Sequence, residues 1–347
     1  MTPLPSTMNV SSATWRRGRQ VLRALGRTLA ALFGLIVVLG LVGAIYESAA
    51  EAADVRAYPP PGQLVDVGGY RLHINCTGAG SPTVVIDAGW GDWSASWSSW
   101  VQPEVAKTTR VCTYDRAGMG YSEPGPLPRT AEHFAKELHT LLQRAAIPGP
   151  YVLVGHSMGG APVRVFAHSY AAEVAGVVLI ESMNPGAVGT PAPATTATPP
   201  DPGALSIINR FLMNLLTLPA RVGLIRLVTG SVAGLSPDDA NAYTAHSVTV
   251  RALEAAIDEG RGMQASLAQA RRVTTLGSVP LIVLSRGLRE GSEAEDAKWQ
   301  LEQSELLQLS SDSRQVFADQ SGHNIQFDQP AAAVGAIVQM VAQLRQP

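Results

Sequence analysis

The 347-residue sequence has few cysteines and little charge: Cys76 and Cys112 are its only cysteines, and charged residues make up 16% of it. With 26 basic and 28 acidic residues its net charge is −2, so it offers no basic footprint for nucleic acid and no nucleic-acid partner is expected. It also lacks zinc-type Cys/His spacing, a phosphate-binding loop and the glycine fingerprint of dinucleotide-binding proteins. We therefore expect neither a metal nor a cofactor, and the sequence predicts no particular oligomeric state.

One long uncharged run is present, at 28–46, and its length suits a helix that spans a bilayer. Arg16, Arg17, Arg19, Arg23 and Arg27 precede this run, and Glu47 and Glu51 follow it. The positive-inside bias then predicts a single-pass cell-membrane protein with a cytoplasmic segment 1–27 and the remaining domain outside. A cleaved signal peptide is the alternative, because Ala50-Glu51-Ala52 resembles a cleavage site and cleavage would give a secreted protein. The length of the run favours the uncleaved anchor, and its uniformly apolar character disfavours a buried core helix.

A second feature is Gly155-His156-Ser157-Met158-Gly159, which directly follows the apolar run 151–154. This is the G-x-S-x-G pattern of a nucleophilic serine on a sharp strand-to-helix turn, where glycines avoid collisions around a strained backbone. We predict a helix over 160–175, ended by Gly176. Because the pattern also arises by chance, an ordinary strand–turn–helix corner is the alternative. The strand before it and the helix after it favour Ser157 as a nucleophile.

A nucleophilic serine needs a base that a third group holds in place, and in this arrangement the acid precedes the histidine in the chain. His323 follows a predicted strand at 315–318 and precedes a last helix opened by Pro330, so it is the predicted base. The other histidines fall inside predicted strands or helices, except for His156, which lies within the serine turn itself.

Two glutamates compete for the role of the acid. Glu181 ends the apolar strand 177–180, where a carboxylate is costly unless it is paired or hydrogen-bonded, and we favour it for that reason. Glu290 follows the strand 281–284 and a glycine-containing turn, and it is the alternative. The acidic residues that come next, Glu293, Glu295 and Asp296, are interpreted as the exposed start of a helix.

Two backbone N–H groups are needed to stabilise the oxyanion that forms when serine attacks a carbonyl. One is expected from Met158, the residue after the nucleophile. The other is expected from Trp90, in the loop Ala88-Gly89-Trp90-Gly91 that follows a predicted strand at 83–87. Taken alone, this loop is equally well explained as a plain turn.

From about residue 63 to 346 the chain resembles the α/β-hydrolase superfamily. Besides the serine turn, Tyr114-Asp115-Arg116-Ala117-Gly118-Met119-Gly120-Tyr121-Ser122 is similar to the family's D-x-x-G-x-G-x-S turn, and Ser321-Gly322-His323 resembles its histidine loop. Ala88-Gly89-Trp90 stands where His-Gly-x is more common. The resemblance implies an α/β fold with a mostly parallel eight-stranded sheet flanked by helices, and a helical cap inserted between strands 6 and 7.

The segment Glu181-Ser182-Met183-Asn184-Pro185 resembles the haloalkane-dehalogenase branch, in which a glutamate that ends the sixth strand is the acid. That branch has an aspartate nucleophile followed by a tryptophan, whereas this chain has Ser157 and Met158. Dehalogenation and epoxide opening, which rely on an aspartyl ester, are therefore not expected, and an acyl-serine intermediate is. The family's usual acid after the seventh strand is matched only by Glu290.

The predicted parts of the chain are 1–27 (cytoplasmic), 28–46 (transmembrane helix), 47–62 (linker), 63–183 (first part of the core), 184–276 (helical cap) and 277–347 (second part of the core). Within the cap, the Pro/Ala/Thr-rich segment 185–202 predicts a mobile loop. The apolar stretch 211–216 is expected to pack on the core, with lining of an apolar acyl pocket as the alternative for part of it. The resemblance also puts Cys76 and Cys112 on neighbouring strands, which implies a disulfide, with two buried free thiols as the alternative.

These features predict a membrane-anchored serine hydrolase acting on a small-molecule partner, an ester of a small or medium apolar acid. Amide or peptide cleavage and acyl transfer are alternatives on the same three residues. A catalytically inactive fold that serves as a binding module is the alternative of another class, and the intact Ser/His/acid set argues against it.

Overall fold

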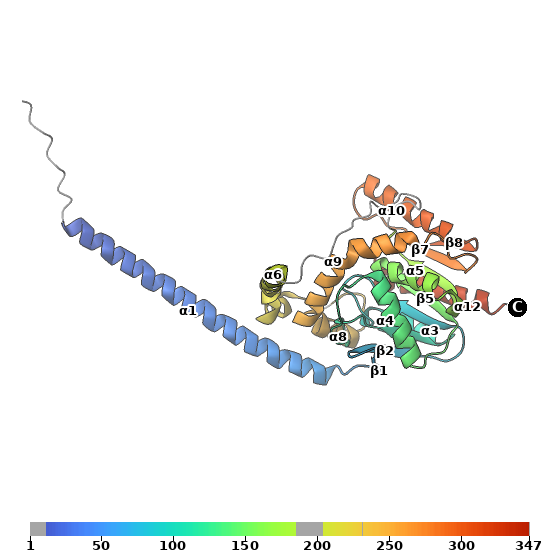
Figure 1. Cartoon of the computed structure of the whole chain (residues 1–347), viewed down its shortest axis with the longest axis horizontal. Coiled ribbons are helices and arrows are strands. Elements are labelled where there is room, and N and C mark those ends of the chain that lie inside the picture. Colours follow the sequence, from blue (N-terminus) through green and yellow to red (C-terminus); the bar gives the residue numbers. More distant parts are fainter. Residues whose placement is uncertain (1–11, 185–203, 231, 347) are drawn as a thin grey trace, which may run out of the picture.

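The computed structural model describes residues 12–184, 204–230 and 232–346, and shows a long N-terminal helix leading into an α/β body (Figure 1). The strands are β1 (Gln63–Asp66), β2 (Arg71–Thr77), β3 (Thr83–Asp87), β4 (Val111–Tyr114), β5 (Tyr151–His156), β6 (Val174–Ile180), β7 (Leu281–Arg286) and β8 (Ser313–Ala318). The helices are α1 (Ser12–Ala57), α2 (Ala95–Ser98), α3 (Val101–Ala106), α4 (Ala131–Arg144), α5 (Gly160–Ser169), α6 (Ala204–Arg221), α7 (Leu224–Val228), α8 (Pro237–Ser247), α9 (Val250–Arg272), α10 (Glu293–Glu305), α11 (Ile325–Asp328) and α12 (Pro330–Leu344).

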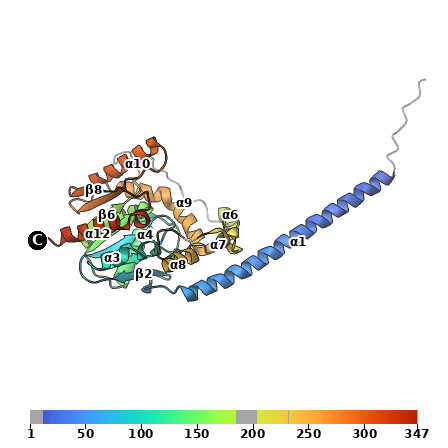
Figure 2. The same ribbon diagram turned by 180° about the vertical axis from the view of Figure 1, so that it is seen from behind.

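The strands form one eight-stranded sheet in the order β1-β2-β4-β3-β5-β6-β7-β8. β2 runs antiparallel to β1 and β4, and the other neighbours are parallel. The central strands β3, β5 and β6 are buried on both faces, which explains their nearly continuous apolar sequences. One apolar core lies between the sheet and helices α4 and α5, and a second lies on the opposite face under α3 and α12 (Figure 2). The predicted fold class is confirmed.

Helices α6 to α9 lie between β6 and β7, where the helical cap was expected, and we call them the insertion. The predicted loop 185–202 falls outside the described residues. The prediction for 211–216 is wrong for the side chains that the structure describes. Leu212, Leu215 and Leu216 are 44%, 56% and 56% exposed, because α6 packs against α9 with the opposite side, where Thr217 and Ala220 are buried.

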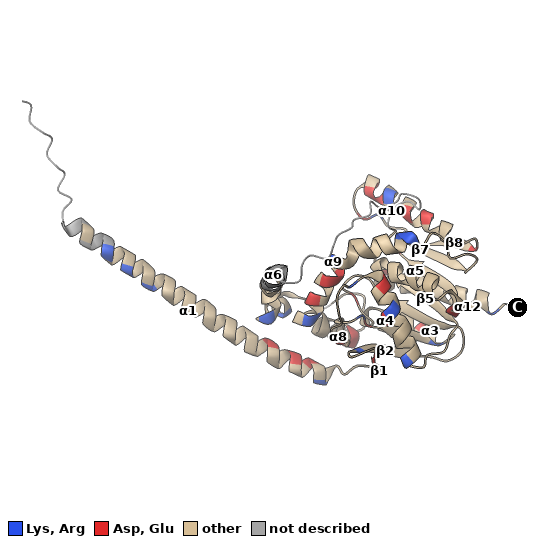
Figure 3. Ribbon diagram, in the orientation of Figure 1, with Lys and Arg blue, Asp and Glu red and all other residues tan. Residues whose placement is uncertain are grey.

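The N-terminal helix α1 is longer than the predicted span 28–46. It continues to Ala57, so most of the predicted linker 47–62 is helical, because its Ala- and Glu-rich sequence favours a helix up to the prolines that follow. The part Arg19–Ala57 is long and apolar enough to cross a membrane. Figure 3 shows basic residues near its N-terminal end, an uncharged middle and acidic residues toward its C-terminal end.

Cys76 on β2 and Cys112 on β4 form a disulfide, as the resemblance implied. The two residues are direct partners in the antiparallel ladder, so the pairing of the strands brings their side chains to the same place. The bond lies at the edge of the sheet where β1 and β2 join the parallel strands.

Replacing both cysteines, in the double variant Cys76→Ala/Cys112→Ala, should lower the free energy of unfolding. The bond closes a segment with a sequence separation of 36 residues, for which loss of the cross-link costs about 3 to 4 kcal/mol in the chain-entropy description. Chemical unfolding of the detergent-solubilised protein measures this. Mass spectrometry of unreduced, alkylated protein from its native compartment is the control, and two alkylated thiols there would contradict the bond.

Candidate active site

Ser157 lies at the sharp turn between β5 and α5, in a single turn of 3₁₀ helix over Ser157–Gly159. Its φ of 52° is in the left-handed region, which a residue with a side chain rarely adopts. The strain is held by the strand before it and the helix after it, and it raises the hydroxyl above the carboxyl end of the sheet.

The glycines around Ser157 are required by close backbone contacts. A Cβ atom on Gly155 would lie 2.7 Å from the oxygen of Gly159, and a Cβ atom on Gly159 would lie 2.5 Å from the backbone oxygens of Asp87 and Ala88. A side chain on Gly160 would collide with Ser182. A side chain at Gly159 or Gly160 would push the turn away from β3 or from the residues after β6, and one at Gly155 would collide with the turn itself.

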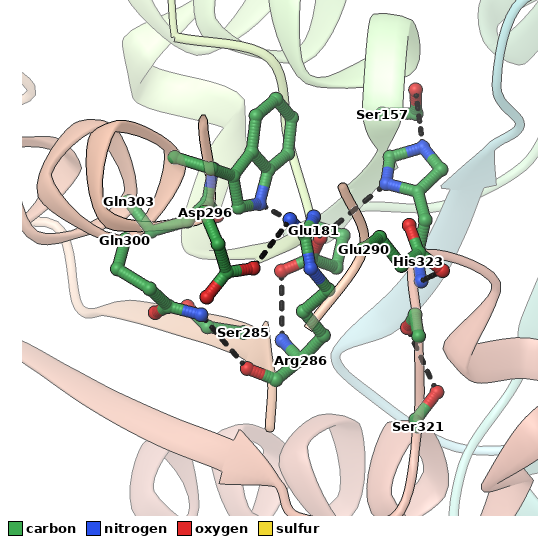
Figure 4. Close-up of polar contacts among 12 residues, drawn as sticks. Ser157, Glu181, Ser285, Arg286, Glu290, Asp296, Gln300, Gln303, Ser321 and His323 are labelled. Carbon is green, nitrogen blue, oxygen red and sulfur yellow. Dashed lines mark hydrogen bonds and ion pairs between the residues drawn. The ribbon is translucent and has the colours of Figure 1, made fainter. Parts of the chain in front are cut away.

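His323 lies in the loop between β8 and α11, and its ring joins Ser157 to Glu181 (Figure 4). Its Nε2 atom is 3.0 Å from Ser157 Oγ, and its Nδ1 atom is 3.3 Å from Glu181 Oε2. An ionised carboxylate only accepts, so we assign the ring proton to Nδ1, which leaves the lone pair of Nε2 facing the serine hydroxyl. The structure thus brings together the three residues that the sequence singled out.

Glu181 directly follows β6 and is fully buried, with a left-handed φ of 45°. Its Oε1 atom accepts a hydrogen bond from the backbone N–H of Arg286 at 2.7 Å. Its Oε2 atom accepts from Arg286 Nη1 at 3.0 Å and from Trp299 Nε1 at 2.8 Å, in addition to His323. The donors satisfy both oxygens of a buried anion that would otherwise be costly.

Arg286 and Trp299 contact Glu181, Asp296 contacts Arg286, and sequence reasoning assigned none of the three to the site. Arg286 lies over the ring of Trp299, 5.2 Å from its centroid, and its Nη2 atom donates to Asp296 Oδ1 at 3.0 Å. The interpretation of Asp296 as part of an exposed helix start is wrong, because the first turn of α10 faces β7 and buries this side chain. Of these three residues, only Arg286 could have been noticed in the sequence, because it is a charged residue at the end of an apolar strand.

Glu290, the alternative acid, contacts the same histidine in another way. Its Oε1 atom accepts from the backbone N–H of His323 at 2.8 Å, whereas the polar partners of the imidazole ring are Glu181 and Ser157. Glu290 itself is exposed. It therefore supports the histidine loop, whereas Glu181 contacts the ring.

His156 packs beside His323, with ring centroids 5.1 Å apart. Burial, together with the nearby charge of His323, lowers the pKa of His156 to about 3. His156 is therefore neutral at ordinary pH, and its Nε2 atom donates to the backbone oxygen of His323 at 3.1 Å. From its place in the serine turn, His156 stabilises the histidine loop through this hydrogen bond and does not act as the base.

The loop after β3, which carries Trp90, lies against Ser157. A Cβ atom on Gly89 would be 3.4 Å from Ser157 Cβ, so glycine permits this close approach. Arg116 holds the loop in place, because its guanidinium donates to the backbone oxygens of Ala88 and Gly89 at 2.7 and 2.5 Å. Met158, the other predicted oxyanion donor, is fully buried at the start of the turn. The roles of the Trp90 and Met158 N–H groups stay predictions.

The insertion takes part in holding this loop through Glu259 of α9. Its carboxylate accepts from Arg116 Nε at 2.6 Å and from the backbone N–H of Gly91 at 3.1 Å. Trp90 Nε1 donates to the backbone oxygen of Ala256, also on α9, at 2.7 Å. Sequence reasoning placed Arg116 in a family motif but missed this contact, since its partner lies 143 residues further along the chain.

Within the described parts of the chain, no group of three or more His, Cys, Asp or Glu side chains is arranged to hold a metal ion. What the arrangement provides is a serine hydroxyl in contact with an imidazole whose other nitrogen faces a buried carboxylate. Such a set can move a proton between the serine and a leaving group.

Comparisons with known proteins agree with the fold. A family model for the alpha/beta hydrolase fold matches residues 82–215. The uncharacterized protein YqjL of Bacillus subtilis is 27% identical over 253 residues, which are 73% of this chain and 81% of that protein. Probable transporter efuK of Hormonema carpetanum is 34% identical over 127 residues, but the chain spans only 18% of its length.

Two solved structures illustrate the structural likeness. Epoxide hydrolase CorEH has a TM-score of 0.59 and 20% identity, covering 82% of this chain and 99% of its own. An esterase from Thermogutta terrifontis has a TM-score of 0.53 and 20% identity, with the same 82% and 99% coverage. At such identities the likeness concerns the fold. Together with the family model and the sheet order, it shows that the chain has the α/β-hydrolase fold.

Proposed function

We propose that the protein is a serine hydrolase that cleaves an ester of a small or medium apolar acid through an acyl-serine intermediate. The observation that carries the proposal is the continuous set of contacts from Ser157 Oγ through the His323 ring to the buried Glu181. The strained turn supports it, because strain of this kind is retained where the surrounding structure serves a function.

In the first half of the reaction, Ser157 Oγ attacks the ester carbonyl while His323 Nε2 takes the hydroxyl proton. The imidazolium that forms is stabilised by Glu181, which also keeps the ring in the orientation that presents Nε2 to the serine. His323 then gives the proton to the alcohol as the C–O bond breaks, which leaves the acyl group on Ser157. Arg286 and Trp299 act as positioning residues, because they fix the carboxylate through direct hydrogen bonds.

In the second half, water replaces the alcohol. His323 takes a proton from the water, the resulting attack forms a second tetrahedral intermediate, and Ser157 leaves with the proton that His323 returns. The N–H groups of Trp90 and Met158 are the proposed donors to the oxyanion in both halves. Because the nucleophile is a serine, the aspartyl-ester chemistry of epoxide opening is not proposed.

The proposed setting is the cell membrane. The apolar part of α1 would span the bilayer, with 1–27 on the cytoplasmic side and the hydrolase body, including a cap at 184–276, on the outer side. Arg19, Arg23 and Arg27 before the span, and the carboxylates after it, support this orientation. The Cys76–Cys112 bond supports it too, since disulfides persist in oxidising compartments.

Ser157→Ala should abolish turnover of p-nitrophenyl esters, with kcat/KM at least about 10³-fold lower, because no other group can form the acyl intermediate. The same variant should no longer react with a fluorophosphonate, while circular dichroism stays unchanged. Ser169→Ala is the matched control, since Ser169 is exposed at the far end of α5. Substantial turnover by Ser157→Ala would refute the nucleophile, and unreactive wild-type protein would favour the binding module.

Glu181→Gln should lower kcat by about 10³- to 10⁴-fold with little change in KM, because an amide no longer favours the productive ring tautomer. Glu290→Gln should be nearly silent, since its amide oxygen can still accept the backbone N–H of His323. Steady-state kinetics on a chain-length series of esters separates kcat from KM. If Glu290→Gln is the crippled variant, the acid belongs to the seventh strand.

Protease added to intact cells or spheroplasts should digest the hydrolase body, because the arginine-rich end of α1 is expected to stay in the cytoplasm. Immunoblotting against the C-terminal part of the chain follows the digestion, and a cytoplasmic marker protein controls for lysis. A fully protected body would overturn the proposed orientation.

A further inference from the structure

Exposed apolar side chains gather on the part of the insertion nearest to α1. Among the described residues outside α1, thirteen large apolar side chains are exposed, and seven of these lie within 212–228. They are Leu212, Leu215, Leu216, Leu218, Leu224, Leu227 and Val228, with exposures from 44% to 74%. We call these seven residues the apolar surface of α6 and α7. A contiguous group of this kind marks an interaction site more often than isolated exposed leucines do.

The apolar surface reverses the usual amphipathic pattern of a surface helix. In a soluble protein the apolar side of such a helix faces the core. In α6 the small or polar residues Thr217 and Ala220 are buried, and the helix packs on α9, whereas the leucines point away from the body. The outward side of α6 is therefore suited to an apolar surrounding rather than to water.

Specific contacts fix α7 beside α1, at the end of its apolar run. Arg226 donates to Glu47 at 2.9 Å and to Asp54 at 2.6 Å. Gly43 lies so close to the backbone of Val222 that a Cβ atom there would be 2.5 Å from the Val222 oxygen. The apolar surface is thereby continuous with the uncovered apolar helix α1, rather than separated from it.

The sequence of α6 and α7 itself contains basic but no acidic residues. Between residues 204 and 237 the sequence has three arginines, Arg210, Arg221 and Arg226, and no aspartate or glutamate. Leucine-rich helices whose own charges are all basic are typical of segments that lie in the interface of a bilayer. Here Arg221 and Arg226 pair with Glu254 of α9 and with Glu47 and Asp54 of α1, so the leucines rather than free positive charges carry the argument.

We propose that α6 and α7 lie in the outer interface of the same bilayer that α1 spans, with the apolar surface buried among the lipid chains. The proposal rests on the proposed membrane span, and not on the proposed hydrolase activity. We choose a bilayer as the partner because the apolar surface adjoins α1. Lipids that surround the proposed span would already contact this surface, so another protein or ligand would have to displace them.

The test uses the full-length protein in vesicles of phosphatidylcholine and phosphatidylglycerol. The native cysteines are bonded to each other, so a single added cysteine can carry an environment-sensitive fluorophore. Leu215→Cys and Leu227→Cys probe the apolar surface. Leu301→Cys is the matched control, an exposed leucine on α10, and Ile36→Cys is the control within the uncharged run of α1.

Nitroxide-labelled lipids should quench the probes at Leu215 and Leu227 several times more than the probe at Leu301, because interfacial helices bury their apolar side by about 5–10 Å. The Ile36 probe should be quenched as well. Quenching at Ile36 with none at Leu215 and Leu227 would overturn the proposal and leave the span standing. An unquenched probe at Ile36 would refute both the span and the proposal. Ester turnover is measured separately in the same vesicles, because the proposal does not depend on the hydrolase activity.

Two further outcomes sharpen the test. Blue-shifted emission at Leu215 without lipid quenching would show that protein, such as a second copy of the chain, covers the surface, which also overturns the proposal. Arg226→Gln, by removing the ion pairs with Glu47 and Asp54, should weaken quenching at Leu227 but not at Ile36. Arg226→Lys should largely restore it.

Discussion

The burial of one carboxylate, that of Glu181, sets the arrangement of the site. A charge with no access to water has to be matched by donors within the protein. The neighbouring strand β7 provides a backbone N–H and the guanidinium of Arg286, and α10 provides the indole of Trp299. Asp296 in turn holds Arg286. The position of the His323 ring then follows, because its Nδ1 atom faces Oε2 of a carboxylate that three other donors keep in place, two of them on Oε2 itself.

The loop 88–91 that follows β3 depends on a second buried charge, that of Arg116, which lies between Asp87 and Glu259 with 2.6 Å contacts to each. Desolvation raises the pKa of Asp87 to about 6 even though the guanidinium opposes this shift. Since Glu259 belongs to α9, the sheet and the insertion share this charge network. Loss of Asp87 or Glu259 would leave Arg116 buried with an uncompensated charge. The geometry of the loop and the position of α9 on the sheet therefore depend on each other.

The parts of the site that could be predicted depend on local constraints. The glycines around Ser157 mark a turn that no other residue permits, and strand ends deliver Glu181 and His323 to one edge of a parallel sheet. The contacts of Trp299 depend instead on how α10 packs, which no local pattern encodes. The helix predicted over 160–175 ends earlier, at Ser169, because β6 begins at Val174 to pair with β5. Tertiary pairing there overrides the local signal for a helix.

A series of direct contacts connects the buried charge network of Arg116 and Glu259 with the apolar surface. α7 is tied to α1 by Arg226, α6 packs on α9, and α9 holds the loop 88–91 through Glu259 and through the backbone oxygen that Trp90 contacts. Each step is a direct contact between described residues. A bilayer that fixes α6 and α7 would therefore act on the same helix that positions the loop beside Ser157. In the proposed arrangement the membrane would be part of the scaffold of the site, and lipid rather than water would surround the exposed leucines of the insertion.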